Sequence, residues 1–129
     1  MILVDSSVWI DHFRRPSAHL VALLDAEQIC MHPFVIGELA CGNLNNRKEI
    51  IALLHALPAV HKADDDEILF FIERHGLNGR CVGLIDIHLL ASCLIDGCFI
   101  WTADRQLQAV AEEMHIEKDR QGWAKRKKG

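Results

Sequence analysis

The chain has 129 residues, enough for one domain with a hydrophobic core and too few for two. Hydrophobic residues make up 50% and charged residues 25%, a composition that excludes intrinsic disorder. The net charge of −4 is unevenly distributed, because residues 1–124 carry 10 basic and 18 acidic side chains while residues 125–128 are all basic. We therefore predict one domain over residues 1–124 and a basic C-terminal tail over residues 125–129. This tail is either a solvated end or an auxiliary phosphate contact.

An acidic body disfavours binding of nucleic acid through bulk charge, but it suits a protein that gathers carboxylates around a divalent cation. The most apolar segment, residues 83–103, is interrupted by Asp86, His88 and Asp96, which disfavours a membrane span. Apolar residues follow Met1 without a basic segment, so we expect no signal peptide and a cytoplasmic location.

The five cysteines are odd in number and form no Cys-x-x-Cys pair, which disfavours a zinc site and favours small buried side chains. The eight histidines are scattered along the chain, and we expect most of them at the surface.

Short apolar runs alternate with segments of helical periodicity along the whole chain. The expected strands are residues 2–4, 28–31, 59–62, 98–101 and 115–118. The expected helices are residues 8–13, 17–26, 34–41, 47–57, 67–75, 84–95 and 105–114. Because the strands are continuously apolar, both faces of the sheet must be covered. The pattern predicts a three-layer α/β/α sandwich with a mainly parallel central sheet, whose ligands bind beyond the carboxyl ends of the strands.

Four carboxylates occupy positions that such a sheet can bring together. Asp5 ends the first strand, and Asp104 follows the strand that ends at Trp101. Glu38 and Asp86 lie in apolar helices without a polar face, so we expect both side chains to be buried and to need a partner. Simpler explanations exist for each residue alone. Asp86 and Asp104 suit helix N-termini, Asp5 suits a turn, and Glu38 can pair with an arginine.

Carboxylates gathered in one pocket either take up protons or bind cations, since two like charges about 5 Å apart repel by roughly 3 kcal/mol. Oxygen ligands without nearby Cys or His select Mg²⁺ or Mn²⁺, as one or two ions. Such an ion activates water and stabilises the leaving oxygen of a phosphodiester. The pattern predicts hydrolysis that leaves a 5′-phosphate and a 3′-hydroxyl.

Four segments in order resemble the motifs of PIN-domain nucleases, and more closely those of the VapC-type toxins of bacterial toxin–antitoxin pairs. They are VDSSVWI at residues 4–10, ELACG at residues 38–42, GLID at residues 83–86 and WTAD at residues 101–104. The similarity extends over almost the whole chain. It implies an endoribonuclease, dependent on Mg²⁺ or Mn²⁺, that cuts structured RNA, commonly transfer or ribosomal RNA. An antitoxin protein encoded beside it would hold it inactive.

The resemblance also implies roles for single residues. It assigns the acidic quartet of the family to Asp5, Glu38, Asp86 and Asp104. It places small hydroxyl groups beside the ions at Ser6 and Thr102, although Ser7 is adjacent and only one of the two serines is expected to face the ions. Members of the family often form homodimers, and antitoxins often place a basic side chain in the acidic pocket.

Arginines that flank the motifs are candidate phosphate contacts, although a solvent-facing charge is the favoured explanation of each one alone. They are Arg14, Arg15, Arg80 and Arg105. Trp9 and Trp101 can stack on a base, but their apolar neighbours favour a place in the core.

Two alternatives remain open at this point. A domain that transfers phosphate through an aspartate, of the haloacid-dehalogenase or receiver type, also places Asp at strand ends and binds Mg²⁺. The dehalogenase motif needs a second Asp two residues after the first, where this chain has Ser7. The other alternative is a PIN-like module that binds RNA or its antitoxin without cutting.

Overall fold

The computed structural model describes residues 1–120, so the predicted basic tail at 125–129 and the last four residues of the predicted domain lie outside the described residues. Helices and strands alternate as the sequence predicts. The elements are β1 (Ile2–Val4), α1 (Ser6–Arg14), α2 (Ala18–Asp25), β2 (Ile29–Cys30), α3 (Pro33–Ala40), α4 (Arg47–Ala56), α5 (Asp65–His75), α6 (Leu84–Asp96), β3 (Phe99–Trp101) and α7 (Arg105–Glu113).

The central sheet is parallel and has the strand order β2-β1-β3. Leu3 of β1 lies in register with Cys30 on one side and with Ile100 on the other. Isolated parallel bridges add one further segment at each edge, at Ala59 beside β2 and at Glu117 beside β3.

The strands expected at residues 59–62 and 115–118 are therefore reduced to single bridges. After Val60, whose N–H donates to the Met31 carbonyl, the chain leaves the sheet. The backbone N–H of His61 donates instead to Asp96 Oδ2 at 2.8 Å. At the other edge a helical turn begins at Lys118 and ends the pairing.

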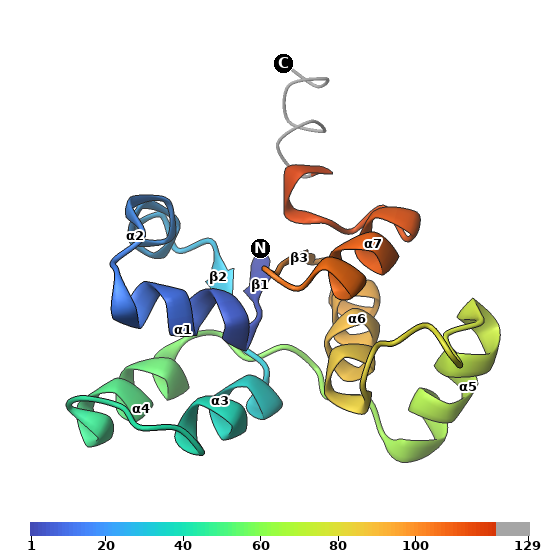
Figure 1. The fold of residues 1–129 in the computed structure, drawn as a ribbon, viewed down its shortest axis with the longest axis horizontal. Helices are drawn as coiled ribbons and strands as arrows, with labels where there is room; N and C mark the ends of the chain where they lie inside the picture. Colours follow the sequence, from blue (N-terminus) through green and yellow to red (C-terminus); the bar gives the residue numbers. More distant parts are fainter. Residues whose placement is uncertain (121–129) are drawn as a thin grey trace.

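Helices cover the sheet on two sides, with α1 to α4 on one side and α5 to α7 on the other (Figure 1). Leu3, Leu89 and Ile100 are completely buried between these layers. The arrangement confirms the predicted α/β/α sandwich. At the carboxyl edge of the sheet, β1 leads directly into α1, and β3 leads through a short turn into α7.

Some details differ from expectation. Serine is a common helix cap and Ser6 and Ser7 precede the apolar residues of α1, so capping by one of them is expected from the sequence; both lie instead in the first turn, because Asp5 is the N-cap residue and accepts the Ser6 N–H. The expected fully buried helix at residues 84–95 is buried only over its middle, since Leu84 is 61% and Ile95 is 50% exposed. Within residues 1–120, no helix is both long and apolar enough to cross a membrane.

The cysteine prediction holds for three residues and fails for two. Cys30, Cys93 and Cys98 are buried, whereas Cys41 and Cys81 are exposed, and none of the five forms a disulfide. Cys41 follows α3 and Cys81 lies in the segment between α5 and α6, where no layer covers them.

Candidate active site

Asp5 is the most firmly held acid of the predicted quartet. It leaves β1 at the carboxyl edge of the sheet and is only 5% exposed. One carboxylate oxygen accepts the Ser6 N–H at 2.7 Å. The other accepts the hydroxyl groups of Ser7 and Thr102 at 2.8 and 2.7 Å. These donors offset the cost of burying the charge and fix the direction of both oxygens.

The same hydroxyl groups fasten the turn that carries Asp104. Ser7 Oγ accepts the Ala103 N–H, and Thr102 Oγ1 accepts the Asp104 N–H, each at 3.0 Å. Asp104 is exposed and caps α7 by accepting the Leu107 N–H, so its predicted capping role is confirmed. The turn after β3 is thus locked to the turn after β1 across the sheet edge.

Ser7, which the sequence left as the adjacent alternative to Ser6, makes the closer contact with Asp5. The resemblance assigned the hydroxyl role to Ser6, whereas Ser7 and Thr102 are the two side chains that support the inner oxygen of Asp5. The available signal was the spacing, because a serine two residues after a capping aspartate can reach back to its carboxylate.

Glu38 approaches Asp5 from the last turn of α3. Ser6 Oγ lies between them, 3.1 Å from Glu38 Oε1 and 3.4 Å from Asp5 Oδ1. The expectation of a buried Glu38 is wrong, because the residue is exposed. On this short helix Val35 and Leu39 face the core, and this leaves Glu38 on the side that opens at the sheet edge.

Asp86 completes the group from the first turn of α6, on the opposite side of the sheet. It is half-buried rather than buried, and one oxygen accepts the Gly83 N–H at 3.3 Å. Burial raises the pKa of this carboxyl, and the negative charges of Asp5, Asp104 and Glu38 raise it further. The charges of the other three acids therefore act on Asp86, although the four residues come from separate elements.

The chemistry of this donor set fits a hard divalent cation, because its members are carboxylates and hydroxyl groups that contact one another. Burial is the larger cause of the raised pKa of Asp86, and the negative charges of the other three acids add to it. Among residues 1–120, no three Asp, Glu, His or Cys side chains stand close enough to form a coordination shell as they are.

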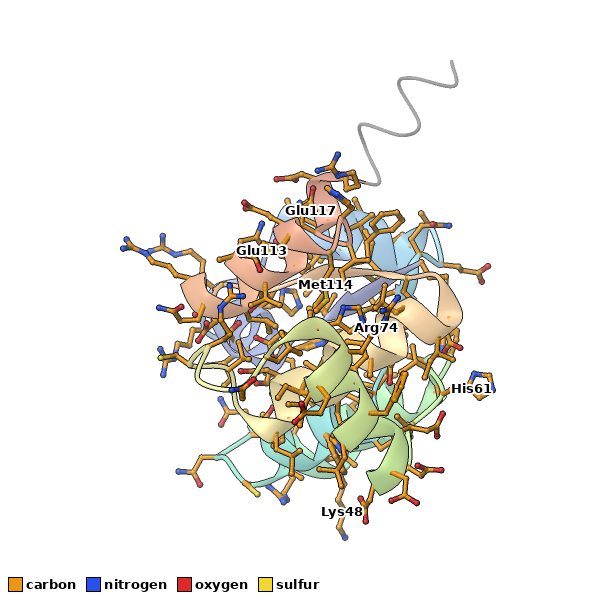
Figure 2. The ribbon with its side chains drawn as sticks, turned by 90° about the vertical axis from the view of Figure 1, so that its right-hand side faces the viewer. Lys48, His61, Arg74, Glu113, Met114 and Glu117 are labelled. Carbon is orange, nitrogen blue, oxygen red and sulfur yellow. The ribbon has the colours of Figure 1, made fainter. Side chains whose placement is uncertain are left out.

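The predicted phosphate contacts are spread around this pocket. Arg14 and Arg15 end α1, Arg105 begins α7, and all three are exposed. Arg80 is already engaged, because its Nη2 donates to both carboxylate oxygens of Glu113 on α7, at 2.9 and 3.0 Å. Figure 2 labels Glu113.

The tryptophans pack as their apolar neighbours suggested. Trp9 is 3% exposed and lies in the core. Trp101 is half-buried, with Lys118 Nζ 4.8 Å from its ring centre and His19 on the ring as well. Neither ring offers a free face to a base in this arrangement.

Six of the eight histidines are exposed or partly exposed, as expected, but two are buried. His32 caps α3 by accepting the Phe34 N–H on Nδ1 at 2.9 Å, and it packs against His88 of α6 with 6.0 Å between ring centres. This pair joins the two helices that carry Glu38 and Asp86. The sequence did not predict the contact between His32 and His88, because the two residues are far apart in the chain and match no motif.

Known proteins share this sequence pattern and this fold. The PIN domain family matches residues 2–113, which is most of the chain. Ribonuclease VapC32 of Mycobacterium tuberculosis, from strains CDC 1551 / Oshkosh and ATCC 25618 / H37Rv, is 42% identical over 117 residues, covering 90% of this chain and 94% of the relative. The crystal structure of PAE2754 from Pyrobaculum aerophilum has the same fold, with a TM-score of 0.61, 16% identity and coverage of 84% and 83% of the two chains.

The chain therefore belongs to the PIN-domain family. Within it, the chain is a ribonuclease of the VapC type. This membership disfavours the alternative of a domain that transfers phosphate through an aspartate.

Proposed function

We propose that the chain is a toxin endoribonuclease whose four acids hold one or two Mg²⁺ or Mn²⁺ ions. The observation that supports this is the raised pKa of Asp86, whose causes include the charges of the other three acids. A half-buried carboxylate that faces three further acids destabilises the fold unless a cation or a proton offsets its charge. The proposed ligands are Asp5, Glu38, Asp86 and Asp104.

A divalent cation at this site supplies an activated water molecule and positive charge for the phosphate. The protein's own groups would set the geometry of that chemistry. Ser7 and Thr102 hold Asp5 so that its oxygens face the pocket, and Ser6 links Asp5 to Glu38. The water would attack the phosphorus in line and leave a 5′-phosphate and a 3′-hydroxyl.

The substrate, by the same proposal, is structured RNA such as transfer or ribosomal RNA. Arg14, Arg15 and Arg105 form no ion pair within residues 1–120, so their guanidinium groups can contact the phosphates of the RNA. Arg80 would have to leave Glu113 to do so. The partners would be an antitoxin with a basic side chain for the acidic pocket, and a second copy of the chain. Five free thiols are consistent with the reducing cytoplasm.

The test is cleavage of total RNA by the antitoxin-free protein, with Mg²⁺, with Mn²⁺ and with chelator. The matched variant is Asp5→Asn, which keeps the N-cap of α1 because asparagine caps helices as well as aspartate does. We expect discrete bands that need the metal and disappear in the variant. Products with a 2′,3′-cyclic phosphate would contradict the hydrolysis by water, and cleavage that survives both chelator and variant would contradict the site.

A further inference from the structure

A groove beside Glu38 is not explained by the acidic site alone. It has a volume of about 820 Å³ and lies between α1, the end of α3, the segment that follows and α4. Its lining includes Ile10, Phe13, Arg14, Glu38, Asn43 and Asn45. Since Glu38 belongs to both, the groove is continuous with the pocket in which we expect the phosphodiester to be cut.

The groove presents the groups that a nucleobase requires. The side chains of Asn43 and Asn45 make no hydrogen bond to any part of residues 1–120, so both amides are available to a ligand. An asparagine amide can donate to and accept from the edge of one base. Phe13 packs against Trp9 and His12, and the part of its ring that stays accessible lines the groove and can contact a base.

The charge around the groove also differs from that of the molecule. Residues 1–124 are acidic overall, yet the groove itself is lined by one cation, Arg14, and one anion, Glu38. Outside the lining, Arg15 is exposed after α1 and Lys48 projects from α4 (Figure 2). These cations complement the anionic phosphates of RNA and disfavour a basic peptide.

Arg47 fixes the segment that forms one side of the groove. Its guanidinium donates to the Gly42 carbonyl at 3.1 Å and to the Ala40 carbonyl, where α3 ends. The guanidinium thereby ties the segment that carries Asn43 and Asn45 to the start of α4. Because this segment is already ordered, less conformational entropy is lost when a ligand binds.

We infer that this groove binds one unpaired nucleotide of the RNA substrate, next to the bond that is cut. Asn43 and Asn45 would read the edge of the base, Phe13 would stack on its face, and Arg14 would contact its phosphate. The inference rests on the proposed ribonuclease function and adds the part of the site that selects the sequence. It requires the nucleotide to be unpaired, because only an unpaired base exposes both its edge and its face.

The test compares wild-type protein, an Asn43→Ala/Asn45→Ala double variant and the control Asn78→Ala, whose exposed asparagine lies between α5 and α6. Fluorescently labelled random RNA octamers are titrated with each protein in Ca²⁺, and binding is followed by anisotropy. We expect the double variant to bind roughly tenfold more weakly and the control to bind like the wild type. In cleavage assays with Mg²⁺, KM should rise more than kcat falls, and the preferred cut sites should change.

Equal binding and identical cut sites in the double variant, with its circular dichroism and melting unchanged, would overturn the groove assignment and leave the ribonuclease proposal standing. Loss of octamer binding in the double variant, combined with no cleavage by wild-type protein, would support the groove and contradict the ribonuclease proposal. Unchanged RNA binding together with loss of a co-purifying protein would show that a protein occupies the groove, which also overturns the inference.

Discussion

Asp5 and Asp86 face one pocket from opposite sides of the sheet, but the fold treats their charges differently. Asp5 is almost completely buried and accepts hydrogen bonds on both oxygens from the chain. Asp86 is half-buried and accepts one backbone N–H at 3.3 Å, while burial and the neighbouring acids raise its pKa. One carboxylate is stabilised by the protein, and the other is left under-compensated.

This difference separates two tasks within the site. The Asp5 side is rigid because hydroxyl groups from α1 and from the end of β3 hold it, and it can therefore direct a ligand. The Asp86 side carries a charge whose repulsion only a cation relieves, so binding of the ion should be linked to stability. Variants of the two aspartates should consequently agree in activity and differ in stability.

The largest effect is expected from Asp86→Asn. Cleavage should fall by roughly 10²–10³-fold, because one ligand and one charge are lost. The pKa of Asp86 is raised in the folded state, so the ionised form opposes folding as pH rises through that pKa, and its removal should increase the melting temperature at pH 7 in chelator. Calorimetry with and without Mg²⁺ tests this, since added Mg²⁺ should stabilise the wild type more than the variant.

Asp5→Asn is the matched control for that experiment. It should lower cleavage by a similar factor, roughly 10²–10³-fold. Its amide nitrogen would face the hydroxyl donors of Ser7 or Thr102, so it should also lower the melting temperature. A lower melting temperature for Asp86→Asn would contradict the view that its charge is under-compensated.

Glu38→Gln should have the next largest effect on activity. The side chain is exposed and shares one hydrogen bond with Ser6, so its replacement should change the free energy of unfolding by less than about 0.5 kcal/mol. Cleavage should fall by roughly 10–100-fold, with a higher Mg²⁺ concentration needed for half-maximal rate. Glu49→Gln on α4 is an exposed control that should leave both quantities unchanged. Equal Mg²⁺ dependence in the two variants would remove Glu38 from the ion site.

The sequence predicted the layers and the position of all four acids, because strand ends and helix starts follow from local patterns. It did not predict how each acid is compensated. The expectation that Glu38 is buried came from its apolar neighbours, but those neighbours face the core while Glu38 faces outward. The choice between Ser6 and Ser7 depends on the contact of Ser7 with the end of β3, almost a hundred residues away. Such contacts have no local signature.

A smaller effect separates the two serines. Ser7→Ala removes a donor to Asp5 and leaves the Ala103 N–H without its acceptor, so it should cost about 1–2 kcal/mol of stability. Cleavage should fall by roughly tenfold because Asp5 is less well fixed. Ser6→Ala should cost less in both respects, since its hydroxyl makes only the two longer contacts. Thermal melts and cleavage rates of the pair decide this, and a larger loss for Ser6→Ala would restore the role that the resemblance assigned to it.

The smallest effect on cleavage is expected from the buried histidine pair, which acts on stability alone. Burial, the neighbouring His88 and Lys62 lower the pKa of His32 to about 4, and His88 is lowered by burial and by Lys62 while Asp65 acts in the opposite sense. The unfolded state therefore binds more protons below pH 6.5, and His32 should cost up to about 3 kcal/mol of stability as pH falls from 6.5 to 4.

His32→Asn tests this contribution, because asparagine can still accept the Phe34 N–H that His32 Nδ1 accepts at the start of α3. Urea denaturation at pH 7, 6, 5 and 4 should show a shallower loss of stability in the variant, while cleavage at pH 7 stays within about twofold of wild type. The exposed His55 provides the control His55→Asn, which should keep the wild-type pH dependence. If both variants lost stability as steeply as wild type when the pH falls, His32 would not be the source of the acid sensitivity. The loss of stability would then have to come from the carboxylates.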